Sequence, residues 1–406
     1  MPYGGAIKSF TTHGQMAGGL LAARVRVSSL PARGRRIRAW RRTLADGDTD
    51  HGPAREKSSR RTLAGVTIAD VARLADVSLM TVSRVLNGKA NVRQQTRERV
   101  QAAIEALNYS PSAAARSLAA ASEIRIGLLY SNPSAGYLNE FLVGSLDQAN
   151  RENVQLVVQL CDSAQRRLET VRRLIEGGID GVILPPPLCD VADLHGLLVD
   201  AGVPAVAVAS GRPPIALSSV NIDDRAAARA MTGHLVSLGH RRIGFVAGNP
   251  DQTASALRLY GYLDALGDAG LASDSDLIAE GLFTYRSGLE AAGALMGLRQ
   301  PPTALFASND DMAAAAVSVA HRMGLDVPGD LSVVGFDDAP QATAIWPELT
   351  TIRQPIAEMS RAAVQLLIED VRARREGHRS LPRHRQMGFE LVRRESDTAP
   401  GGRAKA

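Results

Sequence analysis

The sequence predicts an α/β protein in which a small all-α module precedes two doubly wound parallel sheets. Two observations predict this fold class. Between Val66 and Ala119, apolar residues recur at helical spacing and are interrupted by short turns. From Ile124 onward, short apolar runs alternate with longer amphipathic segments, which is typical of parallel strands joined by helices.

The all-α module is predicted to hold three helices. The first begins at Thr67, where the hydroxyl and the carboxylate of Asp70 make a start that resembles a capping box. Ala75-Asp76-Val77 interrupts the pattern, and Ser78 is a good N-cap for a second helix. A third helix is expected from about Gln94, with apolar residues that close a small core, namely Val100, Ile104 and Leu107.

The second helix is expected to bury Val82 and Val85 and to turn its other side chains outward. Those side chains are short, polar or extended: Leu79, Met80, Thr81, Ser83, Arg84 and Asn87. A helix with such a face suits the major groove of DNA. The alternative is a small helical bundle with no role in DNA binding, which leaves the polar and basic face unexplained.

Two runs, DVARLADVSLMTVSRVLNG and TRERVQAAIEALNYSPSAAARSLA, resemble the DNA-binding headpiece of the lactose-repressor/purine-repressor family of bacterial transcription regulators. The resemblance implies a helix-turn-helix headpiece over residues 63–110 and a hinge helix over 111–122. It also implies a repressor that binds double-stranded, pseudo-palindromic operator DNA as a homodimer, under the control of a small effector.

The resemblance assigns DNA contacts residue by residue. Leu79, Met80 and Arg84 are expected to contact base edges, and Arg84 is suited to a bidentate hydrogen bond with guanine. Phosphate contacts are expected at Thr67, Ser78, Thr81, Ser83 and Asn87. In the hinge, the implied contacts are Ser112, Arg116 and Leu118, with Leu118 as a minor-groove wedge. The competing interpretations make Met80 a packing residue and Leu118 an ordinary linker residue.

Charge is spread unevenly along the chain. Residues 1–65 hold thirteen Lys and Arg against four Asp and Glu, residues 66–119 hold seven against four, and the remainder carries a net charge of −7. A basic front on an acidic body fits a DNA-facing end. Residues 1–62 are predicted to be disordered, and three interpretations stay open: a wrongly assigned start, a basic arm that adds nonspecific phosphate affinity, or a targeting segment.

Residues 123–397 resemble the periplasmic-binding-protein fold that the family uses for effector sensing and dimerisation. An N-subdomain is expected at about 123–222 plus 353–382, and a C-subdomain at about 223–352 plus 383–397. Predicted strands are IRIGLLY, VQLVVQL, GVILPPP, PAVAVAS, RRIGFVAG, TALFAS and LSVVGFDD. Residues 398–406 are expected to form a disordered tail.

The effector should lie beyond the carboxyl ends of the strands. The expected contacts follow those strands or match family positions: Ser131, Tyr137, Arg258, Phe283, Asn309, Asp337 and Gln354. Asp310 and Asp338 follow strands too and are either ligand contacts or helix caps. Amide, carboxylate and guanidinium groups around an aromatic ring favour a sugar. Pro185 and Ala209 stand where the lactose repressor has polar contacts, which argues against a lactose-like ligand.

Other classes of protein are disfavoured. Cys161 and Cys189 give neither a disulfide framework nor a metal site, so no cofactor or metal is expected, and no apolar run is long enough to cross a membrane. No catalytic constellation is found, which disfavours an enzyme. A cytoplasmic location is expected. The alternatives are a regulator with a purine, nucleoside or sugar phosphate as co-repressor, and a periplasmic-type solute-binding protein.

Overall fold

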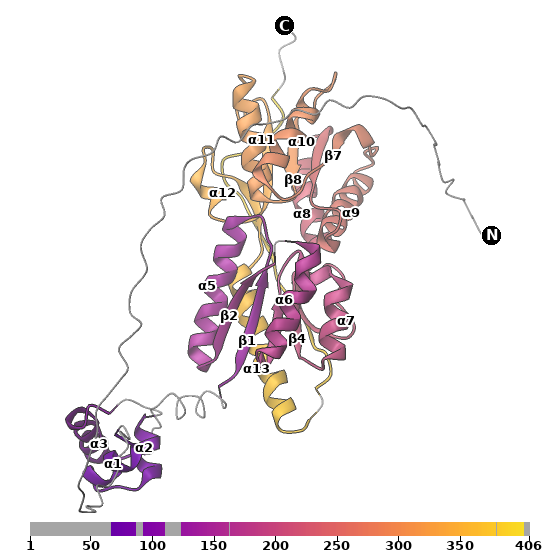
Figure 1. Ribbon diagram of the computed structural model, residues 1–406. Helices are drawn as coiled ribbons and strands as arrows, with labels where there is room; N and C mark the ends of the chain where they lie inside the picture. The colour runs from indigo at the N-terminus through magenta and orange to yellow at the C-terminus, as the bar shows by residue number, and fades with distance from the viewer. Residues whose placement is uncertain (1–65, 87–91, 110–122, 162, 379, 402–406) are drawn as a thin grey trace, which may run out of the picture. The chain divides into compact units, whose positions relative to one another are not determined.

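The computed structural model describes residues 66–86, 92–109, 123–161, 163–378 and 380–401 (Figure 1). Residues 66–109 form the predicted helices: α1 (Ile68–Leu74), α2 (Leu79–Leu86) and α3 (Gln94–Ala106). Their core is built on the buried side chains of Val71, Val82, Val85 and Val100. Asp76 forms the turn between α1 and α2 with φ 50°, a left-handed conformation that aspartate tolerates.

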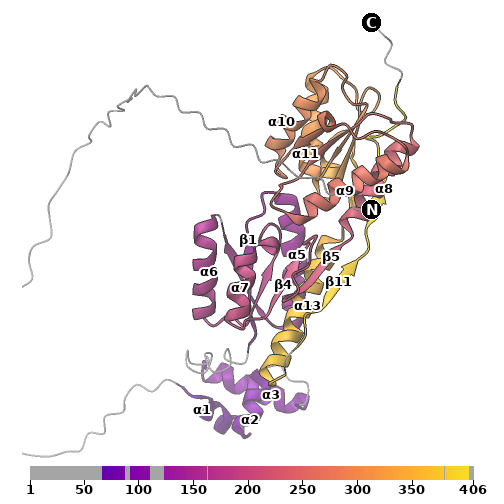
Figure 2. The same cartoon turned by 90° about the vertical axis from the view of Figure 1, so that its right-hand side faces the viewer.

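The N-subdomain is built on a parallel six-stranded sheet with the order β11-β5-β4-β3-β1-β2. Its strands are β1 (Arg125–Tyr130), β2 (Gln155–Leu160), β3 (Gly181–Leu184), β4 (Ala205–Val208), β5 (Ser218–Ile222) and β11 (His384–Met387). Figure 2 shows α6 (Ala164–Glu176) and α7 (Ala192–Asp200) on one face, and α5 (Ala135–Glu152) and α13 (Ile356–Arg375) on the other.

The C-subdomain repeats this plan with the strand order β12-β10-β9-β8-β6-β7, in which only β12 is antiparallel. Its strands are β6 (Ile243–Ala247), β7 (Ile278–Glu280), β8 (Ala304–Ala307), β9 (Ser332–Asp337), β10 (Thr350–Arg353) and β12 (Glu390–Val392). Its helices are α8 (Asp224–Ser237), α9 (Thr253–Asp268), α10 (Tyr285–Met296), α11 (Asp310–Arg322) and α12 (Gln341–Ala344).

The described chain passes between the two sheets three times: after β5, after β10, and between β11 and β12. The last passage corrects one boundary, because we assigned residues 383–397 to the C-subdomain. His384–Met387 instead pair in parallel with β5 at the edge of the first sheet. This strand is mostly exposed and polar, so its sequence carries little of the apolar pattern that marks a buried strand.

The end of the core also differs from the expectation of a tail that starts at residue 398. The backbone carbonyl of Thr398 accepts hydrogen bonds from His240 Nε2 at 2.8 Å and from Ser332 Oγ at 3.1 Å. The Thr398 amide donates in return to Ser332 Oγ at 3.0 Å. Thr398 therefore belongs to the packed C-subdomain.

Candidate functional site

Helix α2 presents a mixed surface because two valines hold its other face in the core. The Thr81 amide donates to Ser78 Oγ at 3.2 Å, which caps the start of α2. The next two residues, Leu79 and Met80, are 53% and 63% exposed. Arg84 is exposed one turn further on. The side chains expected to touch bases are therefore accessible, and their contact with DNA stays a prediction.

The other residues expected to bind DNA have different positions. The hydroxyl of Thr67 donates to Asp70 Oδ2 at 2.7 Å, and the Thr67 amide donates to the same oxygen at 3.0 Å, so this threonine serves the start of α1. Ser83 is half-buried on α2. Asn87 and the three hinge residues Ser112, Arg116 and Leu118 lie outside the described residues.

A groove of about 430 Å³ lies beside α2 and includes basic residues that the sequence argument missed. One side is lined by Ser78, Thr81 and Arg84, and the other by Val92, Arg93, Thr96 and Arg99. Arginines beside threonine hydroxyls at the start of α3 suit a phosphate backbone. The run VRQQTRER, which is basic and begins a helix, was the signal that could have identified them.

A cleft between the two subdomains collects most of the predicted effector residues. Six of them line it: Tyr137, Arg258, Phe283, Asn309, Asp337 and Gln354. Ser131 does not; its neighbours Asn132 and Ser134 do, together with Pro186, Ala209, Gln252 and Ala254. The free volume is about 30 Å³, far below the ~300–1,000 Å³ of small-molecule pockets. The subdomains are therefore closed on each other in this structure.

Arg258 is the central cation of this cleft and is held on several sides. Its Nε donates to Asp224 Oδ1 at 2.8 Å and one terminal nitrogen donates to the Ser308 carbonyl at 2.6 Å. The guanidinium carbon lies 3.6 Å from the centre of the Phe336 ring, a cation–π arrangement. Because α9, α8 and β9 all contribute to its position, the arginine is fixed before any ligand arrives.

Three residues that line the cleft have strained backbone. Ala209, Phe283 and Asp337 have φ angles of 56°, 57° and 115°, which side chains with a Cβ rarely adopt. Gly248 lets the Phe283 ring approach the backbone, because a Cβ there would lie 1.9 Å from the ring. Backbone strain of this kind clusters at ligand-binding sites.

Buried polar atoms near the cleft lack partners. Among the described residues, no hydrogen bond reaches Tyr137 Oη, Ser308 Oγ, Gln354 Oε1 or Asp224 Oδ2. Burial raises the pKa of the Tyr137 hydroxyl well above its usual value, with Asp337 as the next largest cause. Burial also raises the pKa of Asp337 to about 7, against the opposing effect of Arg258. Unpartnered buried groups are costly, so a ligand that pairs with them would bind favourably.

Two polar contacts bridge the subdomains beside the cleft. Asp190, just before α7, accepts from the amide and from the hydroxyl of Thr253, both at 2.8 Å, and from Ser210 Oγ at 2.6 Å. It thereby caps α9, which has no side-chain cap of its own at Gln252. On the other side, Ser134 at the start of α5 interacts with the Asp311 carboxylate and opposes the rise in the pKa of Asp311 that burial causes. Neither contact could be predicted from the sequence, because the partners lie far apart along the chain.

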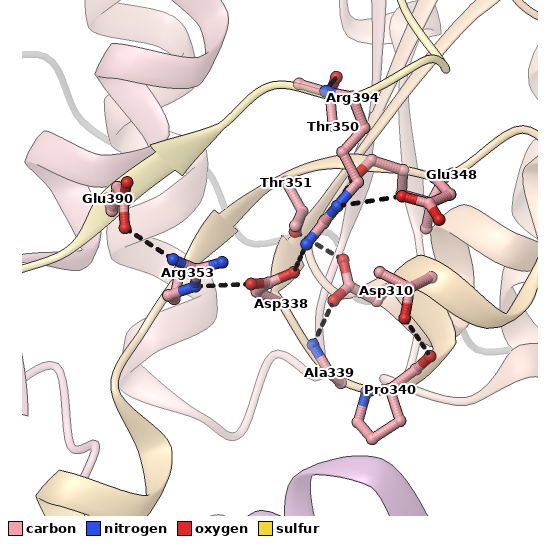
Figure 3. Close-up of polar contacts among 12 residues, drawn as sticks. Asp310, Asp338, Ala339, Pro340, Glu348, Thr350, Thr351, Arg353, Glu390 and Arg394 are labelled. Carbon is pink, nitrogen blue, oxygen red and sulfur yellow. Dashed lines mark hydrogen bonds and ion pairs between the residues drawn. The ribbon is translucent and has the colours of Figure 1, made fainter.

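The two acidic residues left open from the sequence have structural partners. Figure 3 shows Asp338 between Arg353 and Arg394, with ion-pair distances of 2.7 and 2.6 Å. Asp310 accepts from Thr351 Oγ1 and from the Ala339 amide, at 2.6 and 2.8 Å. Asp338 therefore neither caps α12 nor lines the cleft, and both side chains hold the loop that carries Asp337.

Asn309 also has a structural task. Its side-chain oxygen caps α11 by accepting from the Met312 amide at 3.0 Å, and its side-chain nitrogen donates to the Phe283 carbonyl at 3.2 Å. Because Asn309 lines the cleft as well, it links the start of α11 to the strained aromatic residue.

The described residues contain no group of three or more His, Cys, Asp or Glu side chains arranged to hold a metal ion. No helix in these parts of the chain is both long and apolar enough to cross a membrane.

Comparison with known proteins identifies the class. Residues 67–112 match the model "Bacterial regulatory proteins, lacI family", and residues 232–396 match "Periplasmic binding protein-like domain". Catabolite control protein A of Priestia megaterium is 35% identical over 305 residues, 74% of this chain and 91% of that protein. The GalR regulator of Escherichia coli is 33% identical over 74% of this chain and 88% of its own length.

Solved structures agree. The lac repressor dimer bound to operator and the anti-inducer ONPF has a TM-score of 0.70 and 29% identity, over 82% of this chain and 99% of its own. The complex of the regulator CelR with cellobiose has a TM-score of 0.63 and 32% identity, over the same shares of the two chains. This chain belongs to the LacI family of bacterial transcription regulators.

Proposed function

We propose that the chain is a homodimeric repressor that reads a pseudo-palindromic operator through α2 and senses a sugar in the cleft. We place it in the cytoplasm, where the DNA lies, and assign it no enzymatic activity. The observation that carries the effector assignment is the convergence of Arg258, Asp337 and Gln354 on one cleft beside the Phe283 ring. Hydroxyl groups of a sugar can form hydrogen bonds with each of these polar groups while the face of the Phe283 ring packs against the sugar ring.

The effector can control DNA binding only if its affinity differs between two arrangements of the subdomains. A ligand that pairs with buried groups of both subdomains favours one arrangement of the subdomains, and it changes DNA affinity only by as much as its affinity differs between the two arrangements. Among the related structures, CelR was solved with cellobiose, and the lac repressor was solved with operator and an anti-inducer.

The test has two stages on the full chain. A random DNA library is selected on the protein, and the recovered sequence should be a pseudo-palindrome. Binding to that sequence is then titrated with glucose, ribose, cellobiose, adenosine and hypoxanthine. A sugar should change operator affinity. A response confined to the purines would overturn the sugar assignment, and failure to select any sequence would overturn the proposal that α2 reads an operator.

Two variants separate the sites. Arg84→Ala should lose about 1–3 kcal/mol of discrimination between correct and mismatched operators and should still bind the sugar. Arg258→Ala should bind operator and lose its response to the sugar. If Arg258→Ala responds like the wild type, the cleft is not the sensing site.

A further inference from the structure

The charge around the cleft is unbalanced toward carboxylates. Among the residues that line it, Arg258 is the single cation and Asp337 the single carboxylate. Arg258 is already paired with Asp224 at 2.8 Å and lies 3.8 Å from Asp337, and both carboxylates are buried. Burial raises the pKa of Asp310 well above its usual value, and the charge of Asp337 is the next largest cause. The buried cation is therefore neutralised before a ligand binds.

Two of the four unpartnered atoms near the cleft can only accept hydrogen bonds, and the other two, Tyr137 Oη and Ser308 Oγ, are hydroxyl oxygens that can accept as well as donate. Gln354 donates its side-chain nitrogen to Asp337 Oδ1 at 2.6 Å, which leaves its oxygen without a partner. Asp224 Oδ2 is a second unpartnered acceptor. A ligand that supplies hydrogen-bond donors satisfies such acceptors, whereas a phosphate or carboxylate adds acceptors and negative charge.

We propose that the cleft selects uncharged or amino-substituted polyols and excludes anionic effectors, because Asp224 neutralises Arg258 and Asp337 adds a second carboxylate. This inference rests on the proposed function in its choice of polyol. It rejects the sugar phosphate that the sequence left open as an alternative. Like charges brought together in a buried site cost several kcal/mol, so we expect at least about a tenfold difference in affinity.

The first experiment compares matched ligands by calorimetry on the full chain at pH 8, where Asp337 is ionised: glucose, glucosamine and glucose 6-phosphate, and ribose with ribose 5-phosphate. In any set where binding is seen, the uncharged or amino member should bind at least about tenfold more tightly than the phosphate. A phosphate that binds as tightly as its parent sugar, or more tightly, overturns the proposal.

The second experiment does not need the true effector. Asp224→Asn keeps the shape of the side chain and releases the charge of Arg258, so inorganic phosphate should bind this variant at least about tenfold more tightly than the wild type. Asp264→Asn is the matched control, because Asp264 pairs with Arg225 between the same two helices but on the surface. It should leave phosphate binding unchanged.

Asp337→Asn is the second variant should Asp224→Asn fail to fold, and it should also gain phosphate affinity. If no sugar binds the wild type, the sugar assignment fails, and the phosphate measurements still decide the charge argument. Unchanged phosphate affinity in the folded variants, or tight phosphate binding by the wild type, overturns it.

Discussion

The bridge at Asp190 gives a prediction that needs no ligand. In Asp190→Ala, the start of α9 loses its cap and the N-subdomain loses its hydrogen bonds to Thr253. Loss of a cap costs about 0.5–2 kcal/mol, and hydrogen bonds to a charged acceptor contribute about 1.5–3 kcal/mol. Both ranges describe the same hydrogen bonds, so they are not added. We expect Asp190→Ala to destabilise the closed arrangement by about 2 kcal/mol, which shifts the equilibrium between closed and open subdomains roughly 30-fold.

The assay is hydrogen exchange by mass spectrometry on the peptide that begins α9. Opening of the subdomains exposes the Thr253 amide, so exchange there should accelerate roughly 30-fold in Asp190→Ala. Asp193→Ala removes a carboxylate from an exposed position three residues further on and serves as the control. Equal exchange in both variants, or acceleration spread over the whole C-subdomain, would refute the view that Asp190 holds the cleft closed.

Burial raises the pKa of Asp337 to about 7, so between about pH 4 and 7 the folded state holds a proton that the unfolded state releases. The free energy of unfolding should therefore fall by about 1.4 kcal/mol for each pH unit within this range. Urea titrations at pH 5 and 8 should show a larger fall in the wild type than in Asp337→Asn. Arg93→Ala should weaken operator and nonspecific DNA alike and reduce the slope of log affinity against log salt by about 1, and an unchanged slope would remove it from the phosphate contacts. Ser396 Oγ accepts from the Thr350 amide and donates to the Val333 carbonyl. Ser396→Ala should therefore lower the free energy of unfolding, measured in urea, by about 2 kcal/mol or more. A loss below about 0.5 kcal/mol would contradict a stabilising role for these two hydrogen bonds.

Elements with a local apolar pattern could be predicted from the sequence, and elements defined by a distant partner could not. Helix α2 and strand β1 match the expectation because their own spacing of buried residues marks them. Strands β5 and β11 were missed because SSVNI and HRQM carry many polar residues. Strand β5 pairs with both β4 and β11, and β11 completes the sheet edge beside β5.

Some residues of the candidate cleft could likewise be predicted from the sequence, and others could not. The sequence predicted Asp337 from its place at the carboxyl end of a strand and Arg258 from the resemblance to the family, and both line the cleft. Asp190 and Asp224 were missed because their tasks depend on residues 63 and 34 positions further along the chain. Pairing at such separations leaves no pattern within a short window of sequence.

The late position of β11 and β12 has a consequence for synthesis of the protein. These two strands complete the outer edges of the two sheets, and both lie between His384 and Val392, close to the end of the chain. During translation, each subdomain therefore has an open sheet edge until residues 384–392 leave the ribosome. Such edges pair readily with other chains, so a message cut short before His384 should yield aggregating protein rather than a shorter working regulator.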